Sequence, residues 1–566
     1  MKIAIRFLFL IVVLIFCFAG ETYRILDIAL FKREYYQRFI NLARATTNKK
    51  FAVRGRILDR NGKILAITTK KIDIGVDPYV AETLSAEKAT QLASLLKIDE
   101  ESIRKAFTRE SYIKNGIEHH RRWKCFANVE DNEIYEQVKA LSIKGVYGVL
   151  HWERIYPNHT LASHVIGFVN KEGIAVCGIE RFMDRFLMGQ DGWVESEKDG
   201  KREELALFRK IVVEPKNGAD VVLTLDIHLQ DMVEEILSET VKKNCAKSGT
   251  IIVSDAQTGE ILTLCNIPTF DCNDYNKAEI SSLRNRAVTD LYEPGSVFKI
   301  VAFSEALQQG VISLQQYFDC QEAEFFHGGK VYLLPRDHTF LGRLSASDVL
   351  RKSSNRGIAQ IAILLGADRL YNAARAFGFG EKTGYGFDGE GVGVLPNPSN
   401  WDNLTITRLP MGHSVSATPI QVHQAMGVLG NGGFLVKPKI IDRVIDVNGE
   451  NLWESESRFV RRVLAEETVD TVRKILHRPD LVLSHIGSIK LAYKTGTSQK
   501  IIDKRYSQDH HISSCSGFFP ADDPCYLVTV VIDDAEIKSG VAYGSKIALP
   551  VFYEIAKILL QRSMSK

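Results

Sequence analysis

Ser296 and Lys299 have the spacing that catalysis by a serine nucleophile requires. Pro294 and Gly295 end the preceding loop and apolar residues then recur at helical spacing, which predicts a helix that begins at Ser296 and carries Lys299 on the same face. A serine hydroxyl is a weak nucleophile until a base removes its proton. A lysine can be that base if burial or another cation lowers its pKa.

The S-x-x-K spacing is weak when taken alone, because the same spacing recurs on predicted helix surfaces, in loops and in the tail. The other serines that precede a lysine by three positions are Ser85, Ser94, Ser102, Ser111 and Ser563. Two later motifs distinguish Ser296: an S-x-N formed by Ser353 and Asn355, and a K-T-G that begins at Lys494 after a predicted strand over 489–494. S-x-x-K, S-D-N and K-T-G together are the set of serine β-lactamases and penicillin-binding proteins. Here Ser354 replaces the Asp of S-D-N.

A second K-T-G, Lys382-Thr383-Gly384, lies in a glycine-rich segment without strand character. The chemistry needs backbone N–H groups presented by a strand edge. We therefore expect the motif at Lys494 to be the functional one.

Further motifs along the chain resemble those of the class B, monofunctional penicillin-binding proteins. Residues 54–66 match the R-G-x-I-x-D-R-N-G-x-x-L-A signature of that family, and residues 218–226 resemble the entry to its transpeptidase domain. Two positions depart from the pattern: Tyr493 replaces a small residue, and residues 411–414 contain His413 and Ser414 in place of a glycine-aromatic-glycine turn. The other matching segments are 154–157, 258–262, 285–287, 418–421 and 431–433, with His164, Gly167, Gly178 and Glu180.

The resemblance implies a peptidoglycan D,D-transpeptidase whose substrate is a stem peptide ending in D-Ala-D-Ala. Carried over by position, Ser296 attacks the penultimate D-Ala carbonyl and Lys299 is the general base. Ser353 relays a proton to the leaving amine, Asn355 holds the stem peptide and orients the base, and Lys494 adds positive charge.

The K-T-G-T segment has binding roles by the same resemblance. Thr495, Gly496 and Thr497 bind the terminal carboxylate, and the backbone N–H groups of Ser296 and Thr497 form the oxyanion hole. β-Lactams mimic the donor and should acylate Ser296. The resemblance implies no metal and no organic cofactor. The nine cysteines are scattered without a C-x-x-C, so their pairing stays open.

One strongly apolar segment, at the N-terminus, precedes the elements that must position these residues. Residues 3–20 carry no charge except Arg6, which lies with Lys2 on the amino side and predicts a cytoplasmic N-terminus. A bulky Phe18 at the −3 position disfavours signal cleavage after Gly20. We therefore expect a single-pass anchor in the bacterial inner membrane with the rest of the chain on its outer, periplasmic side.

The 566-residue chain has ordinary globular composition, with 45% hydrophobic and 25% charged residues. Its net charge of +3 offers no basis for nucleic-acid binding. Strands at both ends of a helix-rich segment predict an α+β fold: an elongated, mostly-β pedestal and a transpeptidase domain with an antiparallel sheet flanked by helices, as in serine β-lactamases. The expected parts are an anchor over 1–20, a stalk helix over 21–50, the pedestal (a dimerisation-type domain) over 51–215 and the transpeptidase domain over 216–566.

Several functions remain open. The S-x-N at Ser353 favours a septal enzyme over an elongation enzyme, which usually carries S-x-D. A septal role implies a SEDS glycosyltransferase of the FtsW type and other division proteins as partners. A serine β-lactamase would need a deacylating base, and a β-lactam sensor would need a cytoplasmic signalling part. Neither is evident in the sequence.

Overall fold

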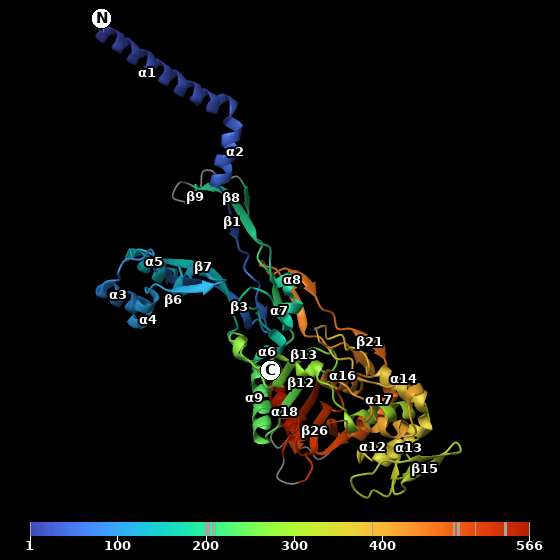
Figure 1. Ribbon diagram of the computed structural model, residues 1–566. Coiled ribbons are helices and arrows are strands. Elements are labelled where there is room, and N and C mark those ends of the chain that lie inside the picture. Colours follow the sequence, from blue (N-terminus) through green and yellow to red (C-terminus); the bar gives the residue numbers. More distant parts are fainter. Residues whose placement is uncertain are drawn as a thin grey trace. The chain divides into compact units, whose positions relative to one another are not determined.

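The computed structural model shows a chain of two compact units, Met1–Arg54 with Met188–Gly218, and Gly55–Leu187 with Ala219–Lys566 (Figure 1). All of the predicted site residues lie in the second unit. The structure describes residues 2–198, 204–205, 209, 211–387, 389–478, 482–483, 487–503, 505–536 and 540–564.

The first unit begins with helix α1 (Lys2–Leu26), a π-helical turn (Asp27–Phe31) and helix α2 (Arg33–Arg44). Residues Ile3–Phe31 are long and apolar enough to cross a membrane, by length and composition. The predicted stalk helix over 21–50 is only partly correct, because the chain leaves the helix at Arg44. Residues 45–50 form strand β1 instead and pair antiparallel with β8 (Gly192–Lys198).

The strand in place of the stalk helix has a local and a distant cause. Thr46 and Thr47 are β-branched and fit an extended backbone better than a helix. Strand β8 supplies the hydrogen-bonding edge, and its other edge pairs with β10 (Ile211–Val213). The distant partner could not be read from residues 21–50 alone.

The second unit opens with a hairpin formed by the residues of the family signature. Strands β2 (Ile57–Leu58) and β3 (Ile64–Val76) are joined by a turn in which the Asp59 carboxylate accepts the backbone N–H of Asn61 and of Lys63, both at 2.8 Å. Strand β3 continues between β6 (Lys124–Val129) and β7 (Val146–Ile155). Three helices pack with these strands around one small core: α3 (Ala86–Leu96), α4 (Glu100–Ala106) and α5 (Asn132–Ala140).

One buried strand joins this signature hairpin to the rest of the unit. Strand β11 (Asp220–Leu223) runs parallel to β2 and antiparallel to β19 (Ile441–Ile445). The Asp220 carboxylate accepts the Arg56 backbone N–H at 2.6 Å and the Arg56 Nε–H at 2.9 Å. Arg56, which stands at a variable position of the signature, therefore links the two segments.

A six-stranded antiparallel sheet forms the centre of the transpeptidase region, which confirms the predicted α+β fold. Helices α9 (Ile227–Lys243) and α18 (Ala548–Met564) pack in one hydrophobic core against it. Helices α11 (Lys299–Gln308), α13 (Asn355–Leu365) and α16 (Pro419–Gly430) belong to a second, larger core. The strand order is β13 (Ile261–Ile267), β12 (Ser248–Asp255), β27 (Tyr526–Asp533), β26 (Arg505–Phe519), β25 (Leu491–Ile502) and β22 (His477–Arg478).

Strand β25 extends further than its sequence predicts. The expected strand ends at Lys494, but β25 continues to Ile502 because β26 pairs with it as far as Ile502 and Arg505. Residues 509–511 belong to β26, which spans Arg505–Phe519. The K-T-G motif therefore lies inside β25, between the buried start of the strand and the hairpin that its far end forms with β26.

Candidate active site

Ser296 lies in a 3₁₀ turn (Gly295–Phe298) that leads directly into helix α11. Gly295 has φ +55°, and a Cβ at this position would lie 2.8 Å from the carbonyl oxygen of Thr497. A Cβ on Gly412 would lie 2.1 Å from the carbonyl oxygen of Gly295. Only glycines permit these approaches, so the Ser296 loop is packed between β25 and the turn at Gly412.

The Lys299 side chain is fully buried and points at the S-x-N motif. Its Nζ donates to the Ser353 carbonyl oxygen at 2.5 Å, to Ser353 Oγ at 3.2 Å and to Asn355 Oδ1 at 2.6 Å. Burial lowers the pKa of Lys299 well below its ordinary value, the positive charge of Lys494 lowers it further, and Asp337 opposes the shift. Burial of this kind favours the neutral amine, which can accept a proton.

Lys494 reaches the same hydroxyl from the strand side. Its Nζ donates to Ser353 Oγ at 2.8 Å and to the Thr495 carbonyl oxygen at 3.2 Å. Burial and the charge of Arg478 lower the pKa of Lys494 to about 7. Ser353, with φ +61°, thus lies between two lysines, in a backbone conformation that non-glycine residues rarely adopt.

Replacing Lys494 with methionine is expected to raise the free energy of unfolding at pH 7 by about 2 kcal/mol. The reason is that the wild-type fold removes a charged amine from water, whereas the methionine side chain is apolar. The pKa of Lys494 is about 7 in the folded chain against an ordinary 10.5, so the unfolded chain binds the proton more tightly between these values. Wild-type stability should therefore rise from pH 7 to pH 10.5, and the variant should show a smaller rise.

Urea unfolding across this pH range measures the effect. Lys490→Met is the matched control, because Lys490 lies close by in the chain but is exposed and pairs with Asp522 at 2.8 Å. A Lys494→Met chain that is less stable than wild type throughout the range contradicts the prediction.

The structure adds Asp337, a residue that the sequence analysis missed. Its carboxylate accepts from Ser354 Oγ at 2.8 Å and from the backbone N–H of Asn355. The Ser354 hydroxyl in turn caps α13 by accepting the Gly357 N–H at 2.9 Å. Asp337 therefore fixes the helix start that presents Asn355. Nothing in the local sequence marks it, since it precedes Ser354 by 17 positions across strand β17 (Arg343–Ser345).

The K-T-G-T segment is packed closely from two sides. A Cβ on Gly496 would lie 2.5 Å from Ser514 Oγ and 2.7 Å from the carbonyl oxygen of Pro294. Thr497 Oγ1 accepts the Gly544 N–H at 2.9 Å, and Thr495 pairs with Cys515 of β26. The structure thus brings every predicted site residue into one connected region.

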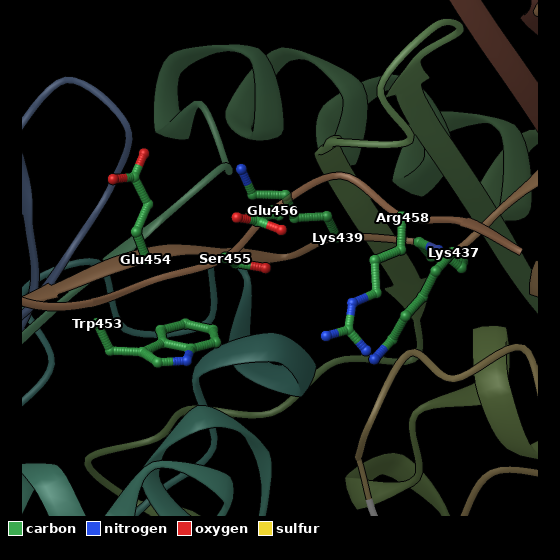
Figure 2. A pocket seen from close by; sticks show the side chains of 8 residues that line it. Lys437, Lys439, Trp453, Glu454, Ser455, Glu456 and Arg458 are labelled. Atoms are coloured by element: carbon green, nitrogen blue, oxygen red, sulfur yellow. The ribbon is translucent and has the colours of Figure 1, made fainter.

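Two other features lie outside that region. Thr383 of the second K-T-G is buried in a loop, where its N–H donates to Glu390 Oε1 at 2.7 Å. A hollow of about 420 Å³ is lined by Lys437, Lys439 and Arg458, and Lys439 pairs with Glu260 at 3.1 Å. The Lys437 and Arg458 side chains converge there (Figure 2). None of the three motifs lines this hollow.

Tyr493 points to the α18 side of the sheet. Its hydroxyl lies 2.6 Å from the hydroxyl of Tyr553, and its ring packs at 5.7 Å from that of Phe552. Neighbouring side chains of a strand point to opposite faces, so this bulky residue stands on the opposite face from Lys494. All nine cysteines are free thiols in the structure.

Comparisons with known proteins agree with this geometry. The family model for the penicillin binding protein transpeptidase domain matches residues 249–557, and that for the penicillin-binding protein dimerisation domain matches residues 49–223. Stage V sporulation protein D of Bacillus subtilis is 31% identical over 89% of this chain and 77% of that protein. Peptidoglycan D,D-transpeptidase FtsI of Escherichia coli is 28% identical over 88% of this chain and 82% of that protein.

Solved structures show the same architecture. A peptidoglycan synthetase from Bifidobacterium adolescentis has a TM-score of 0.70 at 25% identity, covering 92% of this chain and 97% of that one. Penicillin binding protein 3 from Mycobacterium tuberculosis, complexed with aztreonam, has a TM-score of 0.67 at 25% identity, covering 91% and 97%. The three motifs, the fold and these likenesses agree: the chain belongs to the class B penicillin-binding proteins and is a serine-type peptidoglycan D,D-transpeptidase.

Proposed function

We propose that this chain crosslinks stem peptides during septal wall synthesis through an acyl-enzyme on Ser296. The observation that carries the proposal is the burial of Lys299 against Ser353 and Asn355, with Lys494 on the same Ser353 hydroxyl. An exposed lysine would be protonated and could not serve as a base, whereas burial and a neighbouring cation favour the neutral amine.

In the acylation step, Lys299 Nζ takes the Ser296 hydroxyl proton while the oxygen attacks the penultimate D-Ala carbonyl. Ser353, between the two lysines, passes its proton to the amine of the departing D-Ala as the peptide bond breaks, and takes up in exchange the proton that Lys299 removed from Ser296. The negative charge on the tetrahedral intermediate is held by the N–H groups of Ser296 and Thr497. Their proximity is supported by the tight packing of Gly295 on Thr497.

In the second step, the amine of another stem peptide attacks the acyl carbon and loses a proton to Lys299. The ester bond to Ser296 breaks, and Lys299 returns that proton to Ser296 Oγ. Asn355 and the Thr495–Thr497 segment hold the donor backbone and its carboxylate, with Asn355 fixed by its bond to Lys299. β-Lactams enter the same first step but leave no departing group, so their acyl-enzyme persists. Persistent labelling by fluorescent penicillin separates this function from that of a β-lactamase, which would turn the probe over.

The domain arrangement is part of the proposal. We assign residues 1–20 to the anchor, 21–50 to the stalk, 51–215 to the pedestal and 216–566 to the transpeptidase domain. Lys2 and Arg6, at the amino end of the apolar segment, support a cytoplasmic N-terminus with the catalytic domain on the other side of the membrane. Alkaline phosphatase fused to the C-terminus should be active, and a well-expressed but inactive fusion would refute this topology.

The septal role rests on the S-x-N at Ser353 and on relatives named FtsI. It implies an FtsW-type SEDS glycosyltransferase and other division proteins as partners, whereas an elongation role implies a side-wall partner. A fluorescent fusion of the full chain should concentrate at midcell in growing cells. Uniform side-wall fluorescence, or normal septation supported by Ser296→Ala in depleted cells, would argue against the septal assignment.

A further inference from the structure

We propose that Glu293, together with His413 and Tyr506, is a positioning clamp that sets the oxyanion hole for acylation. The inference rests on the proposed role of Ser296 as nucleophile. It concerns three residues that lie outside the three motifs and have no part in the proposed mechanism.

The Glu293 carboxylate binds three donors at once. Its Oε1 accepts the Ser414 backbone N–H at 2.9 Å and the Tyr506 hydroxyl at 3.0 Å, while its Oε2 lies 2.7 Å from His413 Nδ1. The side chain of Glu293 is 11% exposed and that of His413 is 18% exposed. Hydrogen bonds to a carboxylate in such a shielded place are stronger than bonds between neutral groups.

These three donors come from two separate elements that flank the nucleophile. His413 and Ser414 follow Gly412, whose backbone packs directly on Gly295. Tyr506 lies on β26, opposite Ile501 in the hairpin that extends the K-T-G strand. The rings of His413 and Tyr506 pack edge to face, with centroids 5.7 Å apart. One carboxylate, three residues before Ser296, therefore ties the nucleophile loop to both neighbours.

The clamp acts on the distance between two backbone N–H groups. Ser296 lies on the loop that Glu293 anchors, and Thr497 lies on the strand whose hairpin carries Tyr506. An oxyanion hole works only when both donors are at hydrogen-bond distance from the developing charge, and a misplacement of about 1 Å can cost roughly 100-fold in rate. Loss of the clamp should therefore slow acylation and leave the first, non-covalent binding nearly unchanged.

Glu293 is not placed as a general base. Both of its oxygens are already engaged by donors, whereas Lys299 contacts Ser353 and Asn355 directly. Burial and the Glu293 charge raise the pKa of Tyr506 to about 12, so its hydroxyl keeps its proton and remains a donor across the working range. These groups hold the loop and do not exchange protons with the substrate.

The test separates binding from acylation in the full-length chain, using a fluorescent penicillin in stopped flow. For Glu293→Gln we expect the acylation rate constant to fall by roughly 10- to 100-fold, the size of a lost hydrogen-bond network to a charged group. Tyr506→Phe should reduce it by about 3- to 10-fold. The dissociation constant of the non-covalent complex should change by less than about twofold in both.

The double variant and a matched control complete the design. Glu293→Gln with Tyr506→Phe should be no slower than Glu293→Gln alone, because both changes break one unit. Tyr526→Phe removes a comparable hydroxyl contact, 2.8 Å from Ser563 Oγ, and should acylate like wild type. Glu293→Asp keeps the carboxylate and should therefore acylate faster than Glu293→Gln.

Wild-type acylation in Glu293→Gln, strictly additive effects, or a change confined to the non-covalent dissociation constant would overturn the clamp. If Glu293→Gln does not fold, Tyr506→Phe and His413→Asn make the same test. Ser296→Ala, measured alongside, separates the clamp from the proposed function. A Ser296→Ala chain that is still labelled refutes Ser296 as the nucleophile. An unlabelled Ser296→Ala chain, together with clamp variants that acylate at the wild-type rate, refutes only the clamp.

Discussion

Ser296→Ala is expected to abolish covalent labelling of this chain by fluorescent penicillin and to reduce transpeptidation by roughly 10⁴-fold or more. The reason is that no acyl-enzyme can form without the hydroxyl oxygen, and the remaining donors only bind and polarise the substrate. Gel fluorescence and mass spectrometry of the labelled peptide measure the loss directly. The variant should unfold at nearly the wild-type temperature, since Ser296 is only partly buried and loses a single oxygen.

Ser102→Ala is the matched control for this experiment. Ser102 also precedes a lysine by three positions, in α4, but its hydroxyl donates to Asp99 at 2.7 Å on an exposed surface. It should label like wild type. Labelling that survives Ser296→Ala, or disappears in Ser102→Ala, would show that the S-x-x-K of the transpeptidase region is not the nucleophile motif.

Lys299→Met is expected to slow acylation by about 10²- to 10⁴-fold, the usual contribution of a positioned general base. Lys299→Arg should fail similarly, because a guanidinium stays charged and cannot accept the serine proton. Lys352→Met is the control: Lys352 is exposed and immediately precedes Ser353 in the chain. Near-wild-type acylation in Lys299→Met would show that another group is the general base.

The same base predicts the pH profile of the wild-type chain. Because burial and the Lys494 charge lower the pKa of Lys299, the amine loses its proton below the ordinary range and becomes competent there. The acylation rate should therefore be low at acid pH, where Lys299 is protonated, and should rise as the pH passes that lowered pKa. The apparent pKa belongs to the Lys299 and Lys494 pair, so Lys494→Met should shift it upward by removing the neighbouring charge. A rate that rises only in the ordinary range of an exposed lysine, or that does not fall at any acid pH at which the chain stays folded, contradicts a buried lysine base.

The local motifs were predictable because their residues are neighbours in the chain. Ser296 and Lys299 share one helical turn, and the hairpin at Asp59 closes over a few residues, so spacing alone indicates the geometry. The apolar segment at the N-terminus is equally local. These features, with the order of the three motifs, were enough to predict the family and the α+β fold.

The remaining decisions depend on residues that are far apart in the chain. Lys299 and Asn355 are 56 positions apart, and Glu293 and Tyr506 are 213 apart, so no spacing rule connects them. The length of β25, the strand over 45–50 and the role of Asp337 each required a partner that only folding supplies. Likewise the lowered pKa values of both lysines arise from burial, which is a property of packing. The sequence by itself therefore determined which chemistry this protein carries, and the tertiary structure decided how the lysines lose their protons and what holds the nucleophile in place.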